Sequence, residues 1–133
     1  MLVELSISNL AIIDHLRLQF SAGFNVLTGE TGTGKSIIID AVSLLLGARA
    51  STDLVRTGAE GAAIEGVFQL APKTLQALQD EFGELGLLDD AEQAAGELII
   101  RREVSAAGRS SARVNGRAVT QSVLRDLGRH LID

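Results

Sequence analysis

A run of eight residues near the start of the chain has the residue types and spacing of a phosphate-binding loop. It follows the pattern G-x-x-x-x-G-K-[ST] and consists of Gly29, Glu30, Thr31, Gly32, Thr33, Gly34, Lys35 and Ser36. Glycine lacks a Cβ atom, so a glycine-rich loop can curl until its N–H groups point at one anion. The pattern therefore predicts that all eight residues contact the phosphates of a nucleotide.

Two side chains at the end of this motif have distinct predicted roles. The ammonium group of Lys35 is expected to reach the β- and γ-phosphates and to stabilise charge on the transferred phosphoryl group. The hydroxyl group of Ser36 is expected to bind Mg²⁺. The predicted ligands are a nucleoside triphosphate and its magnesium ion.

The segments on either side of the motif predict a strand, a loop and a helix in that order. Residues 24–28 are apolar and β-branched, as in a buried strand, and residues 37–46 are typical of a helix. This helix is apolar nearly all round, which predicts that it is buried between layers, and Gly47 is expected to cap it. A glycine-rich turn that ends in Lys-Ser by chance is the alternative, and both flanking elements argue against it.

Composition limits the class of protein. The chain has 133 residues, of which 46% are apolar, enough for one domain, or part of one, with a hydrophobic core. It has no cysteine, which excludes disulfides and cysteine-bound metals and fits a reducing compartment. Its two histidines, His15 and His130, do not suggest a metal site. The chain shows neither a signal peptide nor a membrane-length apolar run, so we expect a cytoplasmic protein without membrane contact.

Charge is distributed unevenly along the chain. The net charge of −5 argues against a dedicated nucleic-acid module, but residues 97–133 hold seven arginines against four acidic residues. Such asymmetry can mark a nucleic-acid face, or it can belong to an ordinary solvated surface, and only the fold decides between them. With four Phe and no Trp or Tyr, a base-stacking platform for single strands is not expected.

Alternating patterns predict several antiparallel strands. Residues 2–8 are expected to point Val3, Leu5 and Ile7 inward, and residues 15–20 are expected to pair with them. Further strands are predicted by the segments 63–70, 97–105 and 109–114. Asn115-Gly116 is the strongest turn signal in the chain.

Two more helices are predicted by capping residues followed by apolar residues at helical spacing. The first begins at Pro72 and presents Leu75, Leu78, Phe82 and Leu85. The second is capped by Thr120 and presents Val123, Leu124, Leu127 and Leu131. Residues 47–61 are expected to be irregular with short structured pieces.

A Walker B strand, which would end in the carboxylate that helps to hold magnesium, is not evident. Residues 87–90 offer only two apolar residues before their aspartates, and residues 131–133 lie at the chain end. The chain is therefore expected to hold the phosphate-binding half of a nucleotide site and not its hydrolytic half.

The segment 27–47 closely resembles the N-terminal sequence of proteins of the bacterial RecN family. Members of this family are SMC-like DNA repair ATPases with an ABC-type head. The segments 5–13, 47–51, 53–58 and 110–117 are also similar, so the resemblance covers essentially the whole chain. One departure is Thr33, where alanine is expected in this family, and its small side chain should not disturb phosphate binding.

The resemblance implies an α/β fold with α+β character. Residues 1–133 would form the N-terminal lobe of an ABC/SMC-type ATPase head, with antiparallel strands plus the strand–loop–helix unit, incomplete and ending before the Q-loop. ATP and Mg²⁺ are the implied cofactors. The lobe alone would be inactive, because the catalytic base would lie outside this chain.

The resemblance also implies partners. Two heads of a homodimer sandwich ATP, the C-terminal half of each head is joined through a long coiled coil, and head engagement is coupled to holding double-stranded DNA ends. The implied process is double-strand break repair and recombination, in the bacterial cytoplasm near the nucleoid. Two minor roles stay open: residues 9–15 would contact adenine or simply fill the core, and Arg49 would sense a ligand or form a surface ion pair.

Two other functions are compatible with the motif alone. A self-contained P-loop kinase for a small molecule would transfer phosphate without a partner. A non-catalytic interaction module would bind its partner in a nucleotide-dependent way.

Overall fold

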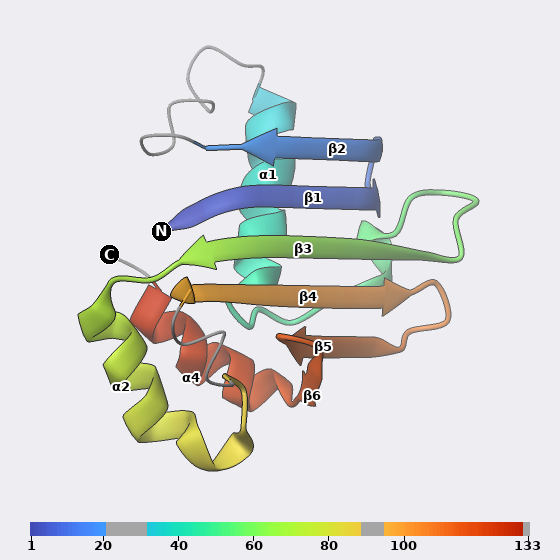
Figure 1. The fold of residues 1–133 in the computed structure, drawn as a ribbon. Coiled ribbons are helices and arrows are strands. Elements are labelled where there is room, and N and C mark those ends of the chain that lie inside the picture. The colour runs from blue at the N-terminus through green and yellow to red at the C-terminus, as the bar shows by residue number, and fades with distance from the viewer. Residues whose placement is uncertain (21–31, 89–94, 132–133) are drawn as a thin grey trace.

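The structure is a computed structural model that describes residues 1–20, 32–88 and 95–131, with the backbone alone for residues 32–35. A six-stranded antiparallel sheet forms its centre (Figure 1). Helix α1 (Gly32–Leu45) crosses one face of the sheet, and helices α2 (Pro72–Phe82) and α4 (Gln121–Leu131) lie together beyond β4 (Glu97–Ser105). The expected α/β class with antiparallel strands is confirmed.

The strand order is β2-β1-β3-β4-β5-β6, and every neighbouring pair is antiparallel. The strands are β1 (Leu2–Leu10), β2 (Ile13–Gln19), β3 (Gly61–Gln69), β4 (Glu97–Ser105), β5 (Ser110–Val114) and β6 (Arg117–Val119). The alternating segments identified in the sequence all fall within these strands or at their ends. Alternation is informative here because one face of the sheet packs on the core while the other faces solvent.

The first strand differs from its predicted pattern at one residue. Leu2 is buried and Val3 is only half-buried, whereas Val3, Leu5 and Ile7 were predicted to share the inward face. The pairing of β1 with β3 shifts register between Leu2 and Glu4, which is the signature of a β-bulge. The extra residue reverses the alternation before Glu4, so the prediction for Val3 was wrong and those for Leu5 and Ile7 are confirmed.

The turn at Asn115-Gly116 is confirmed by its backbone. Both residues have positive φ angles, 50° and 83°, as a two-residue type I′ hairpin turn requires. The turn connects β5 to β6, a strand that the sequence did not predict because three residues are too few to show alternation. The segment before β3 is irregular as expected, apart from a 3₁₀ turn at Thr52–Leu54.

Helix α1 packs on the sheet through one of its faces. Ala41, Leu44 and Leu45 are fully buried there. Ile39 is 54% exposed on the opposite face, and Ser43 is exposed near it. The prediction that this helix is buried all round was therefore wrong for this chain, because only one layer of the described structure covers it.

Helices α2 and α4 pack against each other. Leu78, Phe82, Leu124 and Leu127 are buried in the core they share with the sheet. Leu85 was predicted to join this apolar face and is instead 50% exposed, because α2 ends at Phe82 and Leu85 lies in the 3₁₀ turn that follows. Among the described residues, no helix is long and apolar enough to cross a membrane.

Candidate functional site

The phosphate-binding motif lies where α1 begins. Gly29, Glu30 and Thr31, like the predicted strand at residues 24–28, are outside the described residues. From Gly32 onward the motif is helical, so Gly32, Thr33, Gly34 and Lys35 form the first turn of α1. The predicted loop-to-helix arrangement is confirmed for its helical part, and the loop and strand remain predictions.

A helix start of this kind suits an anion. The first four N–H groups of an α-helix have no acceptor within the helix, and the helix dipole places positive charge at the same end. In α1 these groups include the N–H groups of motif residues 32–34. Ser36 follows directly and is exposed, so its hydroxyl group is accessible to a ligand at this end. The backbone and Ser36 thus fit a magnesium-bound phosphate chain.

The opposite end of α1 is held by the protein itself. Gly47 has a φ angle of 98° and its N–H donates to Leu44 O at 3.2 Å, which confirms its predicted capping role. The Arg102 guanidinium donates to Leu44 O at 2.8 Å and to Ala48 O at 2.9 Å. The Gln121 side chain donates to Gly47 O at 3.1 Å. The carbonyl groups at the end of the helix and just beyond it therefore receive donors from β4 and α4.

Arg102 is the residue that sequence reasoning missed. It was counted among the arginines of a possible surface, but it is 1% exposed and lies in the core. Burial lowers the pKa of its guanidinium, because the charged form loses hydration. The signal was present in the alternation of β4, where Leu98, Ile100 and Val104 point inward and position 102 belongs to the same set.

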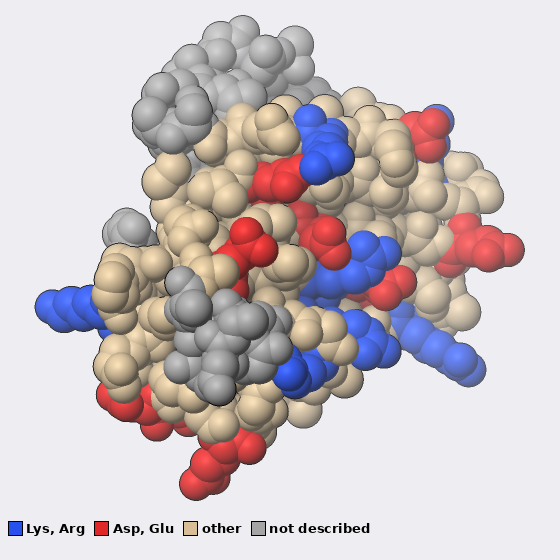
Figure 2. All heavy atoms as spheres, in the orientation of Figure 1, with Lys and Arg blue, Asp and Glu red and all other residues tan. Residues whose placement is uncertain are grey.

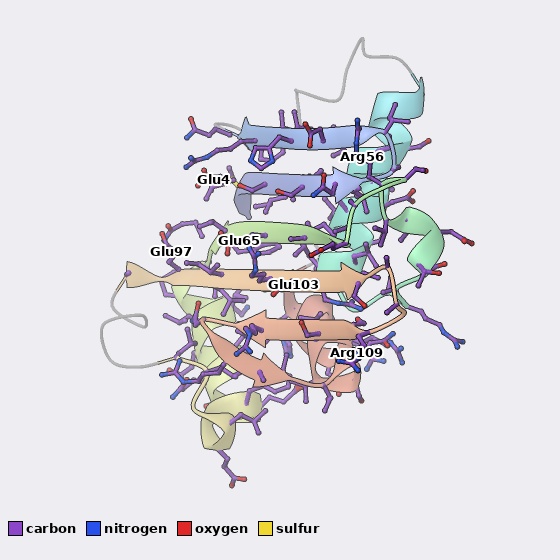
Figure 3. All side chains as sticks on the ribbon, turned by 90° about the vertical axis from the view of Figure 1, so that its right-hand side faces the viewer. Glu4, Arg56, Glu65, Glu97, Glu103 and Arg109 are labelled. Atoms are coloured by element: carbon purple, nitrogen blue, oxygen red, sulfur yellow. The ribbon has the colours of Figure 1, made fainter. Side chains whose placement is uncertain are left out.

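The other arginines of residues 97–133 lie on different elements, although Arg101 and Arg113 are cross-strand partners on β4 and β5. Arg101 points to the solvent side of the sheet, where it lies 3.7 Å from Glu65 and 3.4 Å from Glu103. Arg129 pairs instead with Asp126 on α4 at 3.6 Å. Figure 2 shows basic and acidic side chains interspersed over the sheet face, and Figure 3 shows Glu4 and Glu65 on the side away from α1. This face carries mixed charge, which favours the reading of an ordinary solvated surface.

The connection between β1 and β2 is tied to the segment before β3. Asn9 O accepts from the Arg56 N–H at 2.8 Å, and the Arg56 side chain donates to Ile12 O at 2.7 Å. Leu10 is buried in the core while Ile12 is 70% exposed, so this connection fills the core through Leu10. An open, polar hollow of about 570 Å³ adjoins it, lined by Asn9, Arg56 and residues 57–61. Arg49 is exposed and forms no ion pair within the described part of the chain.

Comparison with known proteins places the chain in a family. The model of a family described as an AAA domain matches residues 4–109. The chain belongs to this family. DNA repair protein RecN of Halalkalibacterium halodurans is 49% identical over 133 residues, and the protein of the same name from Bacillus subtilis is 49% identical over 137 residues. The expected resemblance to RecN is confirmed over the whole of this chain. Each alignment covers all of this chain and 22% of the relative.

Solved structures agree on the fold. An SMC ATPase, studied for ATP-driven dimerization and DNA-stimulated activation, matches with a TM-score of 0.74 and 26% identity over 99% of this chain and 80% of that one. An Smc head bound to the C-winged helix domain of ScpA matches with a TM-score of 0.71 and 26% identity over 98% of this chain and 41% of that one. The recombination mediator RecF, at 19% identity and a TM-score of 0.66 over 93% of this chain and 29% of that one, supports the fold alone. The expected SMC-type head architecture is thereby confirmed.

Proposed function

We propose that this chain is the ATP-binding lobe of an SMC-like ATPase that acts in DNA double-strand break repair and recombination. One observation carries the proposal: the motif residues 32–36 begin helix α1 in a chain that is 49% identical to DNA repair proteins named RecN. Residues 1–133 would then be one part of an ABC/SMC-type head domain. The kinase alternative is not favoured, because the neighbouring folds are SMC and RecF proteins.

Within this site the motif residues divide the work of holding ATP. The N–H groups of residues 29–34 would surround the phosphates, Lys35 would stabilise charge on the γ-phosphoryl group, and Ser36 would bind Mg²⁺. When bound, Mg²⁺ would neutralise part of the negative charge of the phosphates. The helical first turn and the exposed Ser36 support this assignment.

The remaining parts of the site would come from other polypeptide segments. We propose that the C-terminal half of the same head covers the outer face of α1, supported by the 54% exposure of Ile39 on an otherwise apolar helix. A second head would complete the ATP sandwich, and double-stranded DNA ends would bind the whole protein. The protein would act in the bacterial cytoplasm close to the nucleoid, since curated relatives are bacterial repair proteins.

A binding titration followed by a complementation assay tests the proposal. Mg-ATP should bind the chain, and Lys35→Ala should weaken binding about 10- to 100-fold, because a charge-assisted hydrogen bond contributes about 1.5–3 kcal/mol. Lys73→Ala, which removes the exposed lysine near the start of α2, should leave the affinity unchanged.

In the complementation assay the chain is mixed with the C-terminal half of a RecN relative that contains Walker B. Magnesium-dependent ATP hydrolysis should appear in the mixture and be absent with Lys35→Ala. The proposal is wrong if the mixture hydrolyses no more ATP than the Lys35→Ala mixture. Phosphoryl transfer to a small molecule by the chain alone would favour the kinase instead.

A further inference from the structure

Arg102 is a buried cation with an unusual set of partners. Within the described residues, its hydrogen bonds go to the main-chain carbonyls of Leu44 and Ala48 and to Ser110 Oγ at 3.1 Å, and none goes to a carboxylate. Its Nε has no acceptor there. Because a buried charge is costly unless its partners compensate, an apolar residue would be the simpler choice at this position of β4. The partners therefore indicate what Arg102 does.

Both carbonyl acceptors belong to the C-terminal end of α1. Leu44 lies in the last turn of the helix and Ala48 lies three residues beyond its final residue, Leu45. The last four carbonyls of a helix lack N–H donors within the helix and lie at the negative end of its dipole; Leu44 O is one of them, and Ala48 O lies just beyond the helix. One terminal nitrogen of the planar guanidinium donates to both carbonyl oxygens. The other terminal nitrogen donates to Ser110 Oγ on β5. Arg102 thus connects the end of α1 to two strands.

Helix α4 restricts the same end of α1 by close packing. A Cβ atom on Gly47 would lie 2.5 Å from Arg125 Cα, and one on Gly128 would lie 2.8 Å from Leu46 O. Both contacts are with backbone or Cα atoms, which cannot move aside without shifting an element. Together with Arg102, these contacts define where the C-terminal end of α1 sits along its own axis.

The two ends of α1 are mechanically linked because the helix is continuous. It has 14 residues, so its ends are about 21 Å apart at about 1.5 Å per residue. A packed helix shifts as a unit, and a displacement at its C-terminal end carries the first turn with it. A misplacement of about 1 Å in a site that positions reacting groups can cost about 100-fold in rate.

We propose that Arg102 is a positioning residue for the phosphate-binding turn, acting through the C-terminal end of α1. The inference rests on the proposed ATP-binding function and adds a residue remote from the nucleotide to it. Arg102 does not touch the ligand. It holds the helix whose first turn does, so its loss reduces ATP affinity beyond what a general loss of stability would cause.

The test compares ATP affinity with stability in matched variants of the whole chain. Arg102→Met removes the donors but keeps a long side chain, and Arg102→Lys keeps a cation that can reach one carbonyl. Leu78→Ala is the stability control, because Leu78 is buried beside Phe82, Leu98 and Leu127, and its apolar side chain donates no hydrogen bond to the carbonyls at the end of α1. Each variant is measured by Mg-ATP titration, by urea unfolding and by hydrogen exchange of the α1 amides.

Arg102→Met should weaken Mg-ATP binding about 10-fold or more and accelerate amide exchange in the first turns of α1. Arg102→Lys should fall between Arg102→Met and the unchanged chain. Leu78→Ala should change the affinity by no more than about 2-fold even where it lowers the urea midpoint as much as Arg102→Met. If Arg102→Met does not fold, Arg102→Lys against Leu78→Ala decides the question in the same way.

Two outcomes overturn the inference while leaving the proposed function intact. One is an affinity in Arg102→Met, or in Arg102→Lys, equal to that of the unchanged chain. The other is an equal loss of affinity in Leu78→Ala at equal loss of stability, which would make Arg102 an ordinary core residue. Failure of the proposed function looks different, because the unchanged chain would then bind Mg-ATP no better than Lys35→Ala.

Discussion

Both ends of helix α1 have backbone groups without hydrogen-bond partners inside the helix, and the two ends differ in what can bond them. At the C-terminal end, side chains from β4 and α4 donate to the carbonyls of Leu44, Gly47 and Ala48. At the N-terminal end, the N–H groups without an acceptor inside the helix include those of motif residues 32–34, and the exposed Ser36 lies in the same end of the helix. The protein satisfies one end with its own groups, and we propose that the other end is satisfied by ATP. A helix whose C-terminal end is fixed by hydrogen bonds holds its N-terminal end in a constant position for a ligand.

The largest effect is expected from crowding the anchored end. Gly47→Ala should lower the free energy of unfolding by about 2–4 kcal/mol, because alanine is strained at a φ angle of 98° and its Cβ would collide with Arg125. Gly58→Ala is the matched control, since Gly58 has a φ angle of 88° but nothing within 4 Å of an added Cβ. Urea unfolding of both variants separates packing from backbone strain, and equal losses would show that the close approach to α4 contributes nothing.

A smaller and more specific effect is expected at the ligand end. Ser36→Ala should reduce the gain in ATP affinity on adding Mg²⁺ by about 10-fold, because a hydroxyl ligand to the metal is lost. Stability should not change, since Ser36 is exposed. Ser43→Ala is the control, because Ser43 is exposed on the same helix two turns further on. ATP titrations with and without magnesium measure the effect, and an unchanged magnesium dependence in Ser36→Ala would remove Ser36 from the metal site.

Helix α4 packs on the C-terminal end of α1, so the N-cap of α4 is a further target for mutation. Thr120 Oγ1 accepts from the Val123 N–H at 3.1 Å, so Thr120→Ala should lower the free energy of unfolding by about 1 kcal/mol. Ser122→Ala, an exposed change in the first turn of α4, should be nearly neutral. Thermal or urea unfolding measures both, and equal stability in the two variants would mean that the cap has no role.

The smallest effect on stability is expected between the two ends. Ile39→Glu should change the free energy of unfolding of this chain by less than about 0.5 kcal/mol, because Ile39 is 54% exposed. It should nevertheless weaken association with the C-terminal half of a RecN relative. Ile12→Glu is the control, since Ile12 is 70% exposed at the β1–β2 turn. Pull-down or light scattering of the mixed halves reports the association, and equal binding by both variants would leave the face of α1 without a partner.

Much of this fold was predictable because one face of the sheet is exposed to solvent and the other is buried against the core. Alternation identified most of the strands, and Asn115-Gly116 identified a hairpin turn through the positive φ angles that it tolerates. The position of Val3 was not predictable, because a β-bulge depends on the partner strand rather than on the local sequence. The short β6 escaped notice for lack of length.

The site was predictable where a motif carried it and not where packing did. Residues 32–36 form the start of a helix as the motif requires, and the phosphate contacts of residues 29–36 remain a prediction. The exposure of Ile39 was missed, because an apolar helix does not reveal how many layers cover it. Arg102 was missed as an anchor because its acceptors lie 54 and 58 residues away in the chain.

Two glycines at the contact between the end of α1 and helix α4 limit which substitutions the sequence can accept. Gly47 and Gly128 each face a neighbouring backbone too closely for any Cβ atom. Gly58 and Gly116 serve only their own turns, where an added side chain would meet open space. Lineages of this protein should therefore exchange glycine for asparagine at 58 and 116 while keeping it at 47 and 128. The spacing between α1 and α4 would thus be inherited through two residues that have no side chain.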